Sequence, residues 1–285
     1  MILVTGTAGA LGTLITRELA DHPSLVAGSR QPDRPTGGIP ARRIDFDDPS
    51  TLASGFDGVD VLVMISAGYA EDDIVQARYR NVVVAAEAAG VRQIVYTSLS
   101  GTGEHLSIVA AHRYAERLLR DSTMDVTILR NGLYAELFAD VARQAAASGA
   151  LTAPMGDGAV ACVAREDLAR VAARVAVEAE ADAGNPHRGR CYELAGVEAV
   201  DARRLAAAVS KVSGREIELR PVELTGLRDA LAATGLRPFE IGHTISMFSN
   251  IAAGFLGDTT TDLARLLPGD PLPVMDIITA AVREP

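Results

Sequence analysis

The sequence predicts an α/β protein, in which a doubly wound parallel sheet is joined to a smaller, mostly helical C-terminal lobe. Through the first half of the chain, short apolar runs alternate with segments whose apolar residues recur at helical spacing. This alternation is typical of βαβ units, whose parallel strands are covered by helices on both faces. The apolar run at residues 59–65 matches a strand that is buried on both faces.

The first half divides into strands and the helices that connect them. Residues 31–40 contain three prolines and two glycines, which indicates a loop. Asp48-Pro49-Ser50 is typical of a helix start, and Gly90 of a helix end. We expect strands at residues 2–4, 24–28, 42–46, 59–65, 93–97 and 126–129. We expect helices at residues 11–20, 48–55, 74–89 and 107–120.

The second half is less regular. Its expected helices lie at residues 135–148, 166–180, 202–212 and 239–256, with a last helix after Pro273. Its expected strands lie at residues 191–194 and 216–222. We therefore predict a nucleotide-binding domain at residues 1–131, to which 155–165 and 190–196 return. Residues 132–285 would form a discontinuous substrate-binding lobe.

Composition narrows the classes of function. The 285 residues carry a net charge of −10, which argues against non-specific binding to nucleic acid or an anionic membrane. The longest apolar stretches, such as Val61–Ala67, are too short to span a bilayer. Two cysteines, Cys162 and Cys191, provide no disulfide framework, and the five histidines are scattered, which predicts no metal site. We expect a cytoplasmic protein.

A glycine-rich turn follows the first predicted strand. Residues 4–12 contain the pattern G-x-x-G-x-x-G, between a strand and a helix, which is the context of a dinucleotide site. Gly6 allows a tight turn, Gly9 lets backbone N–H groups reach a pyrophosphate, and Gly12 lets the helix approach the sheet. Thr7, Ala10 and Leu11 complete the predicted cofactor-binding turn. A tight turn without a ligand is the alternative. With this turn, the predicted sheet is of the Rossmann type.

Arg30 follows the second predicted strand, where NAD-preferring sites usually have an acid. Residues 24–32 contain no acid, and a guanidinium suits a 2′-phosphate. We therefore predict NADP(H) as the cofactor, with a solvated Arg30 as the alternative. Asp45 and Phe46 end the third strand, where the Asp45 carboxylate either accepts from the adenine amino group or caps a helix.

Several further segments resemble a known family. They are Asn81–Val91 leading into Ile94–Ser98, then 129–134, 156–158, 164–167 and 192–196. With the glycine turn and Arg30, they resemble the NmrA-like atypical short-chain dehydrogenases/reductases, and within these the NADPH-dependent quinone oxidoreductase branch. The resemblance covers nearly the whole chain. It implies a small apolar or aromatic carbonyl substrate, and a homodimer is possible.

The resemblance also implies roles for individual residues. Ile65, Ser66 and Ala67 would flank the cofactor ribose. Thr97 would join the cofactor site and Ser98 would supply an active-site hydroxyl. Asn131 would lie beside the nicotinamide carboxamide. The residues implied to face the substrate are Tyr69, Tyr134 and Phe138.

The catalytic Tyr-x-x-x-Lys pair of most short-chain reductases is missing. That pair places a lysine four residues after the tyrosine, on the same helix face, where it lowers the pKa of the tyrosine. Tyr114 has Leu118 at that position, and Lys211 is the only lysine of the chain. His112 is then a candidate proton donor, because its ordinary pKa lies near neutrality, and Ser98 a candidate for polarising the carbonyl. Tyr114 is a further catalytic candidate, which would line the site without a lysine partner. A helix-surface histidine and a strand-end hydroxyl are the alternatives.

Two functions follow from these features. The first is an NADPH-dependent oxidoreductase that transfers hydride to a quinone or a similar conjugated carbonyl, whose reduced form needs little proton assistance. The second is a non-catalytic, NADP(H)-binding redox sensor that acts through a partner protein. The missing pair argues against a ketoreductase or an epimerase.

Overall fold

The computed structural model describes all residues except 34–36, 69, 182–183, 221 and 284–285. The chain divides into two compact units. Unit 1 contains residues 1–99, 110–131 and 166–192, and unit 2 contains residues 100–109, 132–165 and 193–285. Each unit is built from discontinuous segments.

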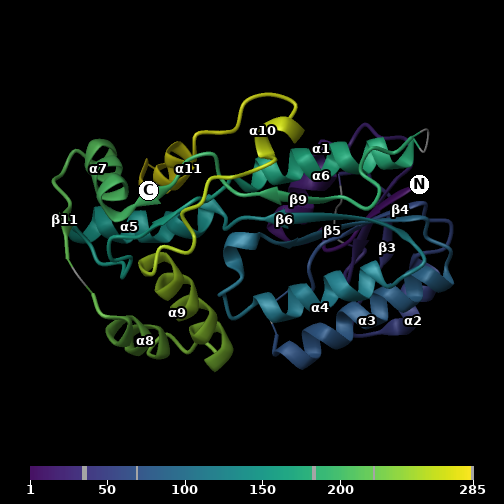
Figure 1. Ribbon diagram of the computed structural model, residues 1–285, viewed down its shortest axis with the longest axis horizontal. Helices are drawn as coiled ribbons and strands as arrows, with labels where there is room; N and C mark the ends of the chain where they lie inside the picture. The colour runs from purple at the N-terminus through teal and green to yellow at the C-terminus, as the bar shows by residue number, and fades with distance from the viewer. Residues whose placement is uncertain (34–36, 69, 182–183, 221, 284–285) are drawn as a thin grey trace. The chain divides into compact units, whose positions relative to one another are not determined.

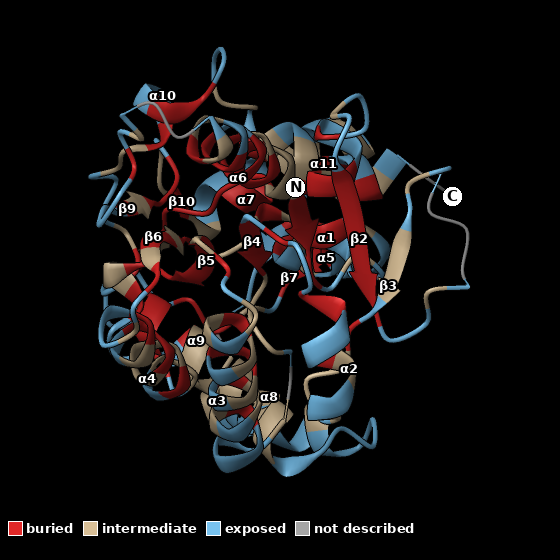
Figure 2. Ribbon diagram, turned by 90° about the vertical axis from the view of Figure 1, so that its right-hand side faces the viewer, coloured by how far each residue is buried: buried red, intermediate tan, exposed pale blue. Residues whose placement is uncertain are grey.

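Unit 1 is formed around a sheet of seven strands in the order β3-β2-β1-β4-β5-β6-β9. The strands are β1 (Ile2–Val4), β2 (Leu25–Ser29), β3 (Ala41–Arg43), β4 (Val61–Met64), β5 (Gln93–Leu99), β6 (Asp125–Asn131) and β9 (Cys191–Leu194). Neighbouring strands from β3 to β6 are parallel. Strands β1, β2, β4 and β5 are buried along their full length (Figure 2). The predicted α/β class with a doubly wound sheet is confirmed.

Helices cover both faces of this sheet. On one face lie α2 (Pro49–Gly55), α3 (Asp72–Ala88) and α4 (Val109–Arg120), and on the other α1 (Ala10–Glu18) and α6 (Arg165–Glu180) (Figure 1). The first of these helical layers shares a core with the sheet, in which Leu62 and Ile94 from strands meet Val82 and Leu119 from helices. Burial of such side chains is the main source of stability for this layer.

The remaining elements belong mainly to unit 2. They are η1 (Gly101–Gly103), η2 (Ala135–Phe138), α5 (Ala139–Ser148), β7 (Ala150–Leu151), β8 (Ala159–Val160), β10 (Val200–Asp201), α7 (Ala202–Ser213), β11 (Glu218–Leu219), α8 (Leu224–Ala232), α9 (Pro238–Ala252), α10 (Leu263–Leu266) and α11 (Val274–Arg283). Helix α11 packs against α5 and α7, and α8 packs against α9. Two short strand pairs, β7 with β11 and β8 with β10, complete the unit.

The segments that return to unit 1 differ in part from the expected ones: of residues 190–196, 190–192 belong to unit 1, and β9 pairs with its sheet. Residues 166–192 join unit 1, whereas 155–165 cluster with unit 2. The returning segment carries α6, whose Glu166 pairs with Arg17 of α1 and whose Ala179 carbonyl accepts hydrogen bonds from Arg92. The expected strand at residues 216–222 is only β11, two residues long. Helix α8 was not among the expected elements, although Leu224, Leu227 and Leu231 recur at helical spacing, and it has no buried residue.

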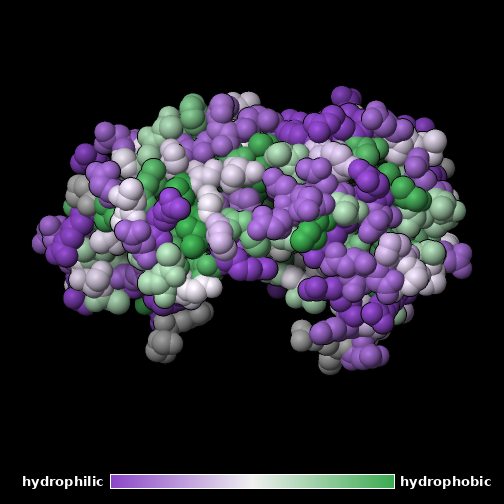
Figure 3. Space-filling model, turned by 90° about the horizontal axis from the view of Figure 1, so that it is seen from below, coloured by the Kyte–Doolittle hydropathy of each residue, from purple (hydrophilic) through white to green (hydrophobic). Residues whose placement is uncertain are grey.

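The described surface carries exposed apolar side chains among polar ones. Figure 3 shows hydrophilic and hydrophobic residues interspersed on the face that it presents. The large apolar side chains that are exposed come from several elements and are Ile74, Val84, Leu137, Val177, Val197, Leu219, Leu236 and Phe255. They identify no dimer interface, and a homodimer stays a prediction. In the part of the chain that the structure describes, no helix combines the length and the apolar composition that a membrane crossing requires.

Candidate nucleotide-binding site

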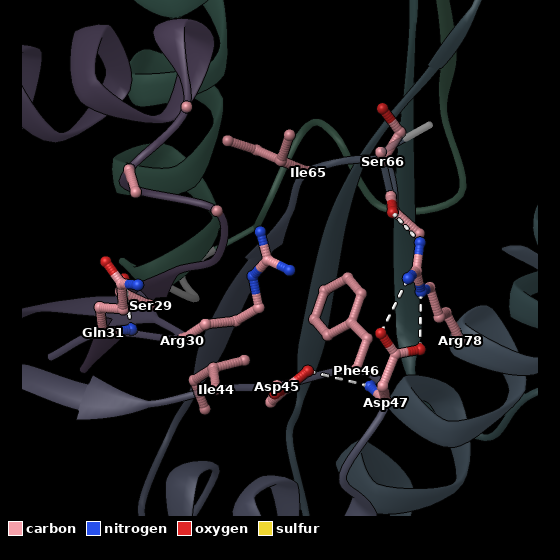
Figure 4. Close-up of a pocket in the computed structure, with 15 residues that line it drawn as sticks. Ser29, Arg30, Gln31, Ile44, Asp45, Phe46, Asp47, Ile65, Ser66 and Arg78 are labelled. Carbon is pink, nitrogen blue, oxygen red and sulfur yellow. Dashed lines mark hydrogen bonds and ion pairs between the residues drawn. The ribbon is translucent and has the colours of Figure 1, made fainter. Parts of the chain in front are cut away.

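A cavity of about 580 Å³ lies within unit 1, at the carboxyl ends of its strands. Loops after β1, β2, β3 and β4 surround it, together with one side chain of α3 (Figure 4). This is the edge of a parallel sheet at which α/β proteins bind ligands. The lining residues are Gly6, Ala8, Gly9, Ser29, Arg30, Gln31, Ile44, Asp45, Phe46, Asp47, Ile65, Ser66, Ala67, Gly68 and Arg78.

The glycine turn forms one wall of the cavity. Gly6 has a φ of +62°, a conformation that L side chains rarely adopt, and its carbonyl accepts a 2.9 Å hydrogen bond from the Gly9 N–H. A Cβ added to Gly12 would lie 2.2 Å from that same carbonyl oxygen. Helix α1 therefore begins closer to β1 than any side chain at position 12 would allow.

The N-terminus of α1 has no competing group. Gly9 is its N-cap, no side chain caps it, and its first turn contains no acid. The Thr13 hydroxyl donates back to the Gly9 carbonyl at 2.9 Å and so does not occupy the N–H groups. Uncapped N–H groups and the helix dipole favour an anion at this position. The turn therefore fits a pyrophosphate. Leu11 and Gly12 are buried behind it, and Thr7 donates to the Gly28 carbonyl at 3.1 Å.

Arg30 directly follows β2, and its guanidinium extends into the cavity (Figure 4). Its two neighbours in the sequence, Ser29 and Gln31, are uncharged. The Ser29 hydroxyl accepts a 3.1 Å hydrogen bond from the Gln31 N–H. No carboxylate from this strand end is therefore available to bind a ribose 2′-hydroxyl. The cation instead suits a phosphate at that position.

The segment after β3 forms the opposite rim. The Asp45 carboxylate lines the cavity and accepts from the Asp47 N–H at 3.1 Å. It does not cap α2, because Asp48 performs that role by accepting from the Ser50 N–H. The helix-cap alternative for Asp45 is therefore wrong. Phe46 also lines the cavity, and Asn81 of α3 donates to its carbonyl at 2.9 Å.

Buried hydroxyls hold the loop after β4. The Thr5 hydroxyl accepts from the Ile65 N–H at 2.9 Å, and the Thr97 hydroxyl from the Ser66 N–H at 3.1 Å. Tyr79 of α3 accepts from the Ala67 N–H at 3.3 Å. Thr97 is 2 % exposed and does not line the cavity. Its place in the site is therefore indirect, through the position of Ser66.

Arg78 and Asp47 were not expected from the sequence. Both line the cavity, and the Arg78 Nε and Nη2 donate to the two oxygens of the Asp47 carboxylate, each at 2.8 Å. These hydrogen bonds outweigh the effect of burial and, with the charges of Arg78 and Arg30, lower the pKa of Asp47. The two residues lie 31 positions apart, so no local pattern indicates the pair.

Ser98 is part of a buried charge cluster. Its hydroxyl donates to the Oε1 of Glu116, a fully buried carboxylate of α4, at 2.7 Å. Arg113 donates to the same carboxylate at 2.7 Å, and Arg130 of β6 binds both of its oxygens. Burial opposes ionisation, but hydrogen bonds from Arg130 and Ser98 and the charge of Arg113 lower the pKa of Glu116 to about 2. Ser98 thus stabilises a carboxylate, and this geometry does not favour a role in polarising a substrate.

The His112 side chain is half-buried beside the buried Tyr96. Its Nδ1 is 2.9 Å from the Tyr96 hydroxyl, and the Tyr79 ring packs edge-on against Tyr96. Burial, together with the charge of Arg113, lowers the pKa of His112 to about 4. The imidazole is therefore neutral near pH 7, which disfavours proton donation by an imidazolium.

The other expected site residues lie in different surroundings. The Tyr114 hydroxyl of α4 accepts a 2.8 Å hydrogen bond from Arg80 of α3. Leu118, four residues after Tyr114, packs against the apolar core. Asn131 ends β6, is buried, and its Oδ1 has no hydrogen-bond partner among the described residues. Tyr69 lies outside the described residues.

The two expected substrate residues of unit 2 differ in exposure. Phe138 is 1 % exposed and belongs to the core of its unit, so in this conformation it offers no surface to a substrate. Tyr134 is half-buried, and the guanidinium of Arg165 lies 4.8 Å from the centre of its ring.

Comparison with known proteins adds to this geometry. Residues 6–179 match a family model described as NAD(P)H-binding. The chain is 35 % identical over 275 residues to quinone oxidoreductase 2 of Escherichia coli, covering 94 % of this chain and 93 % of that protein. It is 29 % identical over 296 residues to an NmrA-like family domain-containing oxidoreductase of Aspergillus flavus, covering 97 % and 93 %. The structure of the Escherichia coli NADPH-dependent quinone oxidoreductase with NADPH superposes with a TM-score of 0.89 at 31 % identity, covering 98 % of this chain and 99 % of that chain.

Replacing Gly12 with alanine should disrupt the nucleotide-binding turn. The added Cβ would overlap the Gly6 carbonyl at 2.2 Å, so the backbone must shift. We expect the free energy of unfolding to fall by about 1–3 kcal/mol, and NADPH binding, measured by calorimetry, to weaken at least about tenfold. Gly242→Ala is the matched control, because a Cβ there meets open space in the described structure. Equal binding by Gly12→Ala and the wild type would contradict the assignment of the turn.

Replacing Glu116 with glutamine should change the dependence of stability on pH. The pKa of Glu116 is depressed from 4.5 to about 2, so its contribution is present above pH 4.5 and is lost as pH falls towards 2. This shift corresponds to about 3 kcal/mol at neutral pH. Urea unfolding of Glu116→Gln should show a lower stability at pH 7 and a flatter profile between pH 5 and 2. The exposed Glu216, which lies outside the helices and strands, provides the control variant Glu216→Gln. An acid profile identical to the wild type would contradict this role of Glu116.

Proposed function

The chain belongs to the NAD(P)H-binding family that matches residues 6–179, and from this premise we propose an NADPH-dependent reductase that transfers hydride to a quinone or a similar conjugated carbonyl. The observation that carries the proposal is the similarity, over 94 % of the chain, to a protein named quinone oxidoreductase 2. The two relatives described above are named as oxidoreductases, and an NAD(P)H-dependent oxidoreductase is the class that this chain shares with them.

The residues of the cavity fit a phosphorylated dinucleotide. The uncapped first turn of α1 would bind the pyrophosphate, and Arg30 the 2′-phosphate. Asp45 and Phe46 would border the adenine, and Ile65, Ser66 and Ala67 the ribose. The buried Oδ1 of Asn131, which has no hydrogen-bond partner in the described structure, could accept from the carboxamide of the nicotinamide. The bound cofactor would supply the hydride, and the protein would place the acceptor and exclude water.

The side chains near the expected catalytic positions favour an acceptor that needs little help with protons. The Ser98 hydroxyl is held by Glu116, the His112 imidazole is neutral near pH 7, and Tyr114 is bound by Arg80. Reduction of a quinone forms a delocalised phenolate, whereas reduction of a simple ketone forms a strongly basic alkoxide. We therefore infer that the chain acts without a Tyr-x-x-x-Lys pair, as the absence of lysine at position 118 also indicates.

The proposed activity is tested directly with a panel of quinones. Purified protein with NADPH should show a loss of absorbance at the nicotinamide band that depends on added quinone, and simple ketones should be poor acceptors. Because the protein would mainly position its two substrates, a variant with weakened NADPH binding should lose turnover with every acceptor when NADPH is limiting. Gly12→Ala, for which we expect at least about tenfold weaker binding, provides this control. NADPH binding without turnover on any quinone would contradict the reductase and favour a non-catalytic redox sensor.

Replacing Arg30 with aspartate should reverse the cofactor preference. The carboxylate would repel a 2′-phosphate and could accept from a ribose 2′-hydroxyl. We expect the Kd for NADPH to rise about 10–100-fold, as for the loss of a charge-assisted hydrogen bond, with little change for NADH. Arg43→Asp is the matched control, because Arg43 is exposed on the adjacent strand and does not line the cavity. Equal weakening of both cofactors would remove the argument for Arg30.

A further inference from the structure

Arg78 of α3 connects two loops of the nucleotide cavity that are separate in the sequence. Its Nε and Nη2 bind both oxygens of Asp47, in the segment after β3, each at 2.8 Å. Its Nη1 donates to the Ala67 carbonyl, in the loop after β4, at 3.2 Å. The Arg78 side chain is 18 % exposed, whereas that of Asp47 is 51 % exposed. The arginine is thus a fixed element of the rim, and the carboxylate is its more accessible partner (Figure 4).

A second cation lies near the same carboxylate. Arg30 and Arg78 both line the cavity. The positive charge of Arg30 also favours the ionised form of Asp47, although less than Arg78 does. Arg78 makes the two hydrogen bonds with Asp47, whereas Arg30 acts only through space. Asp47 is therefore an anionic neighbour of both arginines. It pairs with Arg78, because only Arg78 binds both carboxylate oxygens.

This arrangement determines which charge the cavity presents to a cofactor. An Asp47 carboxylate without Arg78 would be drawn to Arg30 and would repel a 2′-phosphate on the same rim. A carboxylate near the ribose is also the group that NAD-preferring sites use to bind the 2′-hydroxyl. Pairing with Arg78 neutralises Asp47 in place and leaves Arg30 available.

We propose that Arg78 is a specificity-determining residue for NADP(H), which acts by holding the Asp47 carboxylate away from Arg30. The inference rests on the proposed function in one respect, namely that Arg30 binds the 2′-phosphate. Arg78 itself is a positioning residue, because its hydrogen bonds are made with Asp47 and Ala67. Lysine would be a poor substitute, since a single ammonium cannot bind both carboxylate oxygens and the Ala67 carbonyl in one planar arrangement.

The test is a double-mutant cycle of Arg78→Gln and Asp47→Asn, with Kd values for NADPH and NADH from calorimetry. Arg78→Gln should weaken NADPH about three- to tenfold, as expected when a partly exposed ion pair is lost. NADH should be unchanged or bind more tightly. Adding Asp47→Asn to Arg78→Gln should restore the affinity for NADPH, because the carboxylate that the loss of Arg78 releases is then absent. Recovery in the double variant is a result that a merely structural role of Arg78 does not produce.

Arg80→Gln is the matched control, because Arg80 lies two residues along the same helix and binds the Tyr114 hydroxyl instead. It should leave both Kd values unchanged. If Arg78→Gln weakened both cofactors equally, and Asp47→Asn gave no recovery, the proposal would be overturned. If Arg78→Gln did not fold, Arg78→Lys would replace it. The proposal then expects a smaller fall in the preference for NADPH, and an unchanged preference would overturn it.

The titrations use no acceptor, so their outcome is independent of whether the protein reduces quinones. A wild type without quinone turnover but with a preference for NADPH would contradict the proposed reductase and leave this inference open to the same cycle. A wild type that bound NADPH and NADH equally would overturn the inference, since Arg78 would then have no preference to protect.

Discussion

An added Cβ on Gly12 would lie 2.2 Å from the Gly6 carbonyl oxygen, so α1 can begin beneath the end of β1 only because residue 12 is glycine. The close approach brings the uncapped first turn of the helix to the carboxyl edge of the sheet. Every other part of the cavity is arranged around that edge. The loops after β2, β3 and β4 reach it because parallel strands end on the same side.

Helix α3 provides the second level of organisation. Three of its side chains hold the far rim of the cavity: Arg78 binds Asp47 and the Ala67 carbonyl, Tyr79 binds the Ala67 N–H, and Asn81 binds the Phe46 carbonyl. A helix inserted between β4 and β5 thus fixes loops that come from β3 and β4. The geometry of the rim therefore depends on contacts between α3 and loop residues that lie 11 to 35 positions away in the sequence.

The sequence predicts what is periodic or local. The doubly wound sheet and the glycine turn could be read directly, because strand runs, helical spacing and glycine positions are local patterns. The Arg78–Asp47 pair could not be predicted, because it joins two loops across the fold. The environments of Ser98 and His112 could not be predicted either. A serine near a strand end gives no sign that its hydroxyl donates to a buried glutamate, and a histidine gives no sign that burial lowers its pKa. Burial and pairing are properties of the folded chain.

The packing of Leu118 limits how this scaffold could change its chemistry. Leu118 occupies the position, four residues after Tyr114, at which other short-chain reductases carry lysine, and it packs against the apolar core. A lysine at position 118 would start from an apolar environment, in which burial of its ammonium is unfavourable. Tyr114 would still be hydrogen-bonded to Arg80. One substitution would therefore not install a tyrosine–lysine pair, and rotation of the whole helix would break the contacts of Glu116. Acquiring a tyrosine–lysine pair on α4 would therefore require repacking of the helix as well as a change at position 118.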